Sequence, residues 1–147
     1  MSIDRKQLEE LCGQTLSETD FSGLGQRITG KVRDSYVDPE RAPGRRTIIV
    51  SDRVSCFDRV VGTIPLKGQI LNQMAAFWFR KTADLVRNHL IAVPDPNVSI
   101  VEECRTLPVE FVMRGYLTGS SSTSMRLIAA DSSRVMISWR IVQSSVR

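Results

Sequence analysis

Two stretches of the chain carry apolar residues at the spacing of a helix with one buried side. Residues 5–12 form the shorter one, which we expect to be a single amphipathic helix. In residues 69–88 apolar side chains recur at spacings of three, four and seven, which predicts a longer helix. The residues expected on its buried side are Leu71, Met74 or Ala75, Trp78 and Leu85.

The segments between these helices have the pattern of strands. Residues 31–37 and 47–52 are separated by the turn-forming run DPERAPGRR, so they predict a hairpin whose first strand follows glycines. Residues 53–68 are dense in charge and are expected to be mostly loop. Two further strands are predicted at 97–104 and 109–117, joined at Leu107–Pro108, because a proline interrupts a central strand.

Composition is that of a soluble globular protein, with 147 residues, 41% hydrophobic and 24% charged. Neither a membrane-spanning apolar run nor a leader-like start is found, so we expect a cytoplasmic protein without a membrane partner. The three cysteines lie far apart, which argues against a disulfide framework and a zinc site. The single histidine, His89, excludes a histidine metal cluster, and its place at a predicted helix end favours a capping or surface role.

The formal net charge of +4 is concentrated at the end of the chain. Residues 126–147 carry +3 of it, in a Ser-, Arg- and Val-rich segment without a sustained helix or strand period. A nucleic-acid surface needs clustered basic residues with aromatic side chains between them, and the rest of the chain has neither. We therefore expect no nucleic-acid partner.

Residues 25–36, GQRITGKVRDSY, superficially match a phosphate-binding P-loop. That pattern requires Ser or Thr after the lysine to hold magnesium, and a buried strand before the first glycine. Here Val32 follows Lys31, and the preceding residues are polar and loop-like. The pattern therefore argues against a P-loop and leaves open what the cluster binds.

Two other polar clusters could bind a ligand. SDRVSCFD, residues 51–58, follows an apolar strand, although a solvated turn explains it equally well. In the second, Arg114 precedes the corner Gly119–Ser120. A guanidinium fork and a Gly-Ser corner suit a phosphate, since the fork matches its oxygens and glycine lets the backbone approach.

Taken together, GKVRD, SDRVSCFDRVVGTIPLKGQILNQMAAFWF and LPVEFVMRGYLTGS resemble the phosphoribosylaminoimidazole-succinocarboxamide (SAICAR) synthetase family, over about residues 22–124. The resemblance implies an α+β fold with an antiparallel nucleotide lobe, similar to the N-terminal lobe of protein kinases, and the start of a second α+β domain. The implied domains are 1–107 for the nucleotide lobe, 108–124 for the beginning of the substrate domain, and 125–147 for an atypical tail.

The resemblance also implies a reaction, in which ATP and Mg²⁺ drive the joining of carboxyaminoimidazole ribotide to L-aspartate. A carboxylate is a poor acyl donor, so the expected route is phosphoryl transfer to it, followed by attack of the aspartate nitrogen. Such chemistry needs positioning and charge neutralisation rather than a protein nucleophile.

Site residues are carried over position by position from the resemblance. Those implied to contact ATP phosphates are Gly30, Lys31 and Arg33. Those implied to bind substrate are Arg53, Ser55, Arg114 and Ser120, the last two at the ribotide phosphate. Those implied in catalysis are Asp52, Asp58 and Lys67, where Lys67 either meets a substrate carboxylate or pairs with an aspartate. Phe77 and Trp78 are expected in the core because of their helical spacing.

The chain departs from the family pattern after residue 124. Family members are longer, and their Asp-Ser/Thr-Lys-x-Glu motif and magnesium ligands lie in a C-terminal half with no counterpart here, so no metal ligand is predicted. The resemblance therefore predicts a truncated, alternatively spliced or frame-shifted product with weak or no activity. The alternative is a non-catalytic fragment that binds nucleotide or ribotide.

Overall fold

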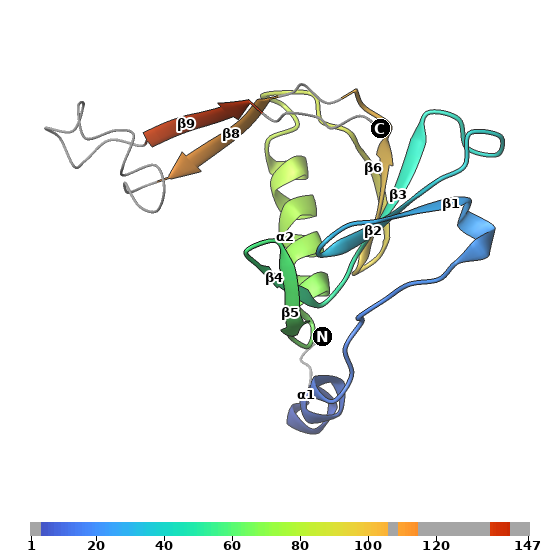
Figure 1. Cartoon of the computed structure of the whole chain (residues 1–147), viewed down its shortest axis with the longest axis vertical. Coiled ribbons are helices and arrows are strands. Elements are labelled where there is room, and N and C mark those ends of the chain that lie inside the picture. Colours follow the sequence, from blue (N-terminus) through green and yellow to red (C-terminus); the bar gives the residue numbers. More distant parts are fainter. Residues whose placement is uncertain (1–3, 106–108, 115–135, 142–147) are drawn as a thin grey trace, which may run out of the picture. The chain divides into compact units, whose positions relative to one another are not determined.

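A computed structural model describes residues 4–105, 109–114 and 136–141, with side chains described only in 4–105 and without that of Leu8. It divides into two compact units, Met1–Cys104 and Arg105–Arg147. The first unit holds all of the helices and seven of the nine strands in the described ranges (Figure 1). No helix within these ranges is long and apolar enough to span a bilayer.

A five-stranded antiparallel sheet, ordered β1-β2-β3-β7-β6, forms the centre of the first unit. Its strands are β1 (Gln26–Thr29), β2 (Arg33–Val37), β3 (Arg45–Val50), β6 (Leu90–Asp95) and β7 (Val98–Glu102). The predicted hairpin is confirmed as β2 and β3, whose register pairs Ser35 with Ile48. β1 and β6 were not predicted: β1 is only four residues long, and β6 contains Pro94 and exposed positions that obscure its period.

Residues 53–68, expected to be loop, instead contain a second hairpin. β4 (Arg53–Cys56) and β5 (Arg59–Thr63) pair antiparallel around Phe57 and Asp58. Both turn residues have positive φ, 48° and 66°, as a two-residue hairpin turn of type I′ requires. Phe-Asp is an unusual choice for that turn, which is why the sequence signal was missed.

The first unit has two α-helices, α1 (Arg5–Cys12) and α2 (Lys67–Lys81), and a short 3₁₀ helix, η1 (Ser22–Leu24). α1 agrees with the predicted bounds, but Leu11 and Cys12 on its predicted buried side are exposed. α2 ends at Lys81 and leaves His89 outside the helix. His89 directly precedes β6, and its ring lies edge-on to that of Phe79 with centroids 5.1 Å apart. The predicted helix-end position of His89 is therefore wrong.

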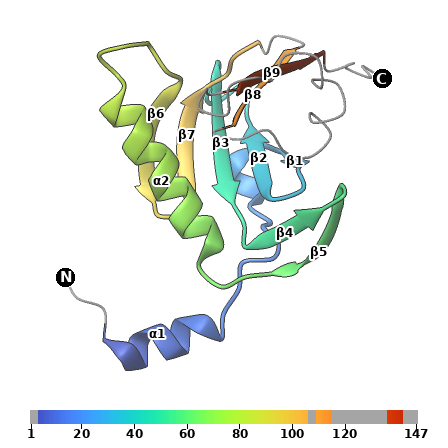
Figure 2. The ribbon, with the colours of Figure 1, turned by 90° about the vertical axis from the view of Figure 1, so that its left-hand side faces the viewer.

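The side of α2 that packs on the sheet differs from the predicted one. The helix lies across the sheet and contacts β3 and β6 (Figure 2). Its buried residues are Gly68, Asn72 and Ala76, at intervals of four. Four of the residues predicted to be buried lie on the other side of α2 and are substantially exposed: Leu71, Met74, Phe77 and Trp78. Leu85, also predicted to be buried, lies beyond the end of α2 and is exposed as well. Only small side chains fit where a helix packs closely on a sheet. The stripe of large apolar residues therefore predicted the wrong buried side of α2.

Asn72 links α2 to the β6–β7 turn through its buried amide. Its Nδ2 donates to the Pro96 carbonyl at 3.0 Å, and its Oδ1 accepts from the Ser99 hydroxyl at 2.7 Å. We expect Asn72→Ala to lower the free energy of unfolding by about 1–3 kcal/mol, because it leaves buried polar groups unsatisfied. Urea unfolding measures this, with the exposed neighbour Gln73→Ala as control; equal effects of the two changes would contradict it.

The second unit contains a two-stranded antiparallel ribbon of β8 (Val109–Arg114) and β9 (Met136–Ile141). β8 agrees with a predicted strand in its position. β9 lies in the segment 126–147, where the sequence shows no sustained strand period, and it pairs with β8 over its full length. That pairing joins segments far apart in the chain, which a local period cannot reveal. Leu107–Pro108 lies outside the described residues.

Candidate functional site: a clamped hairpin turn

The Gly30–Val32 segment is the turn between antiparallel strands β1 and β2. The Gly30 N–H donates to the Arg33 carbonyl at 2.8 Å and closes the turn. A Cβ at Gly30 would lie 2.9 Å from that same carbonyl oxygen, so the turn favours glycine. A P-loop leads from a strand into a helix, whereas a strand follows here, which confirms that the segment is not one.

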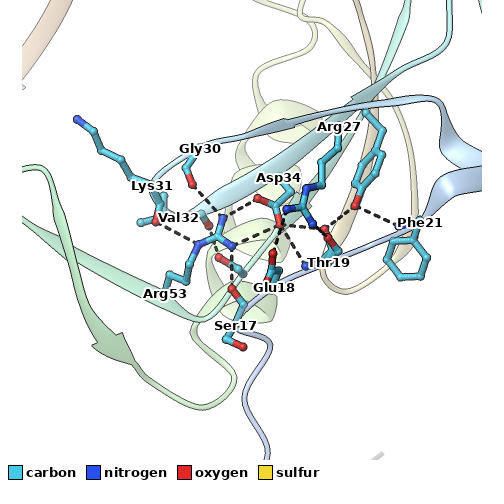
Figure 3. A network of polar contacts seen from close by, with 12 residues as sticks. Ser17, Glu18, Thr19, Phe21, Arg27, Gly30, Lys31, Val32, Asp34 and Arg53 are labelled. Atoms are coloured by element: carbon cyan, nitrogen blue, oxygen red, sulfur yellow. Dashed lines mark hydrogen bonds and ion pairs between the residues drawn. The ribbon is translucent and has the colours of Figure 1, made fainter.

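Arg53, at the start of β4, extends its guanidinium to the backbone of this turn (Figure 3). Its Nη2 donates to the Gly30 carbonyl at 3.0 Å and its Nε to the Lys31 carbonyl at 3.2 Å. The remaining donors reach the Ser17 carbonyl and the carboxylate of Asp34. All five N–H groups of the guanidinium therefore have acceptors inside the protein.

This geometry does not support the predicted substrate-binding role of Arg53. The residue is 7% exposed and pairs with Asp34, which is 0% exposed, at 2.8 Å. A guanidinium with every donor in use has none left for a substrate phosphate or carboxylate. Arg53 is a structural residue of the turn in this arrangement.

Asp34, on β2, is the buried counter-ion of this cluster. The Thr19 hydroxyl donates to its Oδ2 at 2.9 Å, and the same hydroxyl is 2.8 Å from the Tyr36 hydroxyl. Burial raises the pKa of Asp34, but hydrogen bonds from Arg53 and Thr19 outweigh it and hold the pKa below its ordinary value. The carboxylate is therefore ionised at neutral pH.

Asp34, Thr19 and Tyr36 belong to this cluster although the sequence did not predict them as site residues. Asp34 and Tyr36 are two residues apart on β2, so a strand reading places them on one face. Thr19 belongs to an irregular segment that no periodicity could align with that strand. Only the folded chain brings its hydroxyl between the two side chains (Figure 3).

Asp52 and Lys67, two predicted catalytic residues, both contact backbone. Asp52 is buried, and its carboxylate accepts from the backbone N–H groups of Leu16 and Gly68, each at 2.8 Å. It thus satisfies an N–H in the first turn of α2, which has no side-chain cap of its own. The Lys67 ammonium donates to the Arg53 carbonyl at 2.9 Å rather than to an aspartate.

Lys31 and Asp58 connect the tips of two hairpins. The Lys31 ammonium, at the β1–β2 turn, lies 2.6 Å from the Asp58 carboxylate, at the β4–β5 turn. Both side chains are mostly exposed, and Phe57 beside them is 97% exposed. The predicted ATP residue Lys31 and the predicted catalytic residue Asp58 are therefore brought together at the surface, where a ligand can reach both.

The remaining predicted site residues make no side-chain contact described above, or lie outside the part of the chain whose side chains the structure describes. Arg33 is exposed at the start of β2, and Ser55 is half-buried at a bulge in β4. Arg114 ends β8 in the second unit, and Ser120 lies outside the described residues. The phosphate corner of Arg114 and Ser120 therefore stays a prediction.

The described residues were also compared with the requirements of a Mg²⁺ site. No group of three or more His, Cys, Asp or Glu side chains in the described ranges could hold a metal ion. Asp34 and Asp52 are committed to Arg53 and to backbone N–H groups, so neither is available as an oxygen ligand. The described residues by themselves do not fit magnesium.

Comparison with known proteins shows which family this fold and sequence belong to. The SAICAR synthetase family profile matches residues 26–137. The phosphoribosylaminoimidazole-succinocarboxamide synthase of Legionella pneumophila (strain Lens) is 47% identical over 110 residues, which are 75% of this chain and 34% of that protein. The enzyme of the same name from Bacteroides thetaiotaomicron is 43% identical over 138 residues, 91% of this chain and 37% of that protein.

Solved structures agree with the sequence matches. The SAICAR synthase of Saccharomyces cerevisiae complexed with SAICAR aligns with a TM-score of 0.64 and 28% identity, over 74% of this chain and 44% of that one. A type-2 SAICAR synthetase in complex with ADP has a TM-score of 0.65 at 19% identity and shares the fold. The chain spans about a third of the length of the Legionella and Bacteroides enzymes. By sequence and by its antiparallel α+β fold, the chain belongs to the SAICAR synthetase family.

Proposed function

We propose that the first unit is the nucleotide lobe of an ATP-dependent ligase, which joins L-aspartate to carboxyaminoimidazole ribotide to give SAICAR, ADP and phosphate. The observation that carries this proposal is the Gly30–Val32 turn, held from behind by Arg53, in a chain of the SAICAR synthetase family. The complexes of related proteins with ADP and with SAICAR support it. Residues 108–124 would begin the substrate domain.

The residues of the turn have the chemistry that phosphate binding needs. Lys31 supplies an exposed ammonium, and Gly30 lets the backbone come close to a ligand. Arg33 adds an exposed guanidinium one residue beyond the turn. In phosphoryl transfer such groups position the nucleotide and neutralise its charge. Mg²⁺ would have to be held by residues other than those described.

The proposal assigns substrate contacts to Lys67 and Asp58, whereas Asp52 and Arg53 stabilise the fold. Lys67 is half-buried with one observed acceptor, so its ammonium has further donors. Asp58 is exposed beside Lys31. In this proposal Ser55 lines the substrate pocket, and Arg114 and Ser120 contact the ribotide phosphate.

A second candidate function is nucleotide or ribotide binding without catalysis. One observation favours it: no group of three or more His, Cys, Asp or Glu side chains in the described part of the chain could hold a metal ion. An enzyme that lacks its metal ligands loses the charge neutralisation on which phosphoryl transfer depends.

Calorimetry and a turnover assay distinguish these functions. We expect the purified chain to bind ADP by titration calorimetry, and to show weak or no ADP release from ATP with aspartate and ribotide. Binding with turnover would establish the ligase for this chain, and binding without turnover would establish the binding fragment. Absence of ADP binding would contradict the ligase, and absence of both ADP binding and ribotide binding would contradict both functions. Lys31→Ala is expected to weaken binding, with the exposed Lys81→Ala as control.

A further inference from the structure

The backbone around Lys31 has an arrangement that an ordinary strand does not. The carbonyls of Gly30 and Lys31 both accept from Arg53, and the Val32 carbonyl accepts from the Ser51 N–H at 3.1 Å and its hydroxyl at 2.9 Å. In an extended strand, successive carbonyls point alternately to opposite sides. Here three successive carbonyls are bound by one short segment, residues 51–53.

The direction of the carbonyls determines the direction of the amides. In a trans peptide the C=O of one residue and the N–H of the next point opposite ways, and the chain has no cis peptide bond in its described part. The Lys31 N–H therefore points away from Arg53, as does the Val32 N–H. Consecutive N–H groups turned to the same side form a concave site for an anion.

We propose that Arg53 is a positioning residue that presets this anion site, by holding the Gly30 and Lys31 carbonyls inward so that the Lys31 and Val32 amides face a nucleotide phosphate. The inference rests on the proposed function and assigns Arg53 a role different from substrate contact. Asp34 keeps the guanidinium in place, because it binds both Nη atoms while Nε and Nη2 reach the turn. The ligand class is the phosphate chain of a nucleoside diphosphate or triphosphate.

Arg53→Lys tests the proposal because it keeps the charge but removes the planar fork. Lysine can pair with Asp34, but its single ammonium cannot reproduce the five-donor arrangement that spans two carbonyls and Ser17. We expect ADP binding, measured by calorimetry, to weaken at least about tenfold. The matched control is Arg46→Lys, which alters the two-pronged ion pair of Arg46 with Glu103, 2.6 Å for each contact, and should leave ADP affinity within about twofold.

A second measurement reads the turn itself, without ligand. The Gly30 amide is hydrogen-bonded across the turn to Arg33, so its exchange with solvent reports opening of the turn. We expect exchange at least about tenfold faster in Arg53→Lys and unchanged in Arg46→Lys. A folded Arg53→Lys protein with wild-type ADP affinity and wild-type Gly30 exchange would overturn the proposal.

Two further outcomes keep the test decisive. If the wild-type chain binds no ADP, the proposed function fails, and Gly30 exchange alone decides whether Arg53 presets the turn. If Arg53→Lys does not fold, Arg53→Gln combined with Asp34→Asn replaces it, since this pair of changes removes both buried charges together and leaves neither unpaired. ADP binding at least about tenfold weaker is then expected, and unchanged binding overturns the proposal.

Discussion

Gly68→Ala is expected to lower the free energy of unfolding by about 2 kcal/mol or more, although alanine is the better helix former. A Cβ at this position would lie 2.3 Å from the Val50 carbonyl oxygen, 2.7 Å from Asn97 Nδ2 and 3.0 Å from the Ser51 carbonyl carbon. Two of these atoms are backbone, so α2 would have to move away from the sheet. Chemical denaturation of the purified chain measures the loss.

The control for this change is Gly62→Ala, on strand β5. A Cβ at Gly62 meets no atom within 4 Å, so its substitution should change stability by no more than about 0.5 kcal/mol. Gly68 is the second residue of α2, and its close approach to β3 supplies a packing reason for glycine there. Equal stability of Gly68→Ala and the parent chain would show that α2 is not held against the sheet as described.

Asp34→Asn is expected to destabilise the chain by about 3–5 kcal/mol at neutral pH, because it leaves the buried guanidinium of Arg53 without a counter-ion. The size of the substituted side chain hardly changes, so the loss reflects charge rather than volume. The control is Glu103→Gln, which breaks the more exposed ion pair with Arg46 and should cost no more than about 1 kcal/mol. Urea unfolding of both variants compares the two pairs directly, and similar losses would contradict a special role for Asp34.

Asp34→Asn should also change how the free energy of unfolding depends on pH. The folded-state pKa of Asp34 is lowered from 3.8, so its contribution is fully present above that value and is lost as pH falls through the folded pKa. We therefore expect the stability of the parent chain to decrease with falling pH below about 4, and the decrease to be smaller in Asp34→Asn. An identical acid dependence in both proteins would contradict the assignment.

Local sequence patterns predicted the secondary structure correctly where it depends on neighbouring residues alone. The helix at 5–12 and the hairpin of β2 and β3 follow from period and turn residues, and both are present. The antiparallel α+β class and the family also follow, because the polar clusters keep their order along the chain. The P-loop could be rejected at Val32 alone.

Predictions failed where several elements had to meet. The larger apolar stripe of α2 suggested burial of Trp78, whereas the buried side is formed by Gly68, Asn72 and Ala76. A hydrophobic period cannot reveal that a helix approaches backbone so closely that only small or hydrogen-bonded side chains fit. Arg53 was likewise read as a ligand contact, since nothing local shows that five acceptors from separate segments surround it.

The sequence by itself determined the family, the antiparallel class and the identity of the polar residues near the turn. Only the tertiary structure decided which of those residues face inward. Arg53 and Asp52 neutralise or satisfy groups inside the unit, whereas Lys31 and Asp58 are left at its surface. The physical reason is that a polar side chain becomes structural or functional according to the acceptors and donors that folding brings to it, and these come from distant parts of the chain.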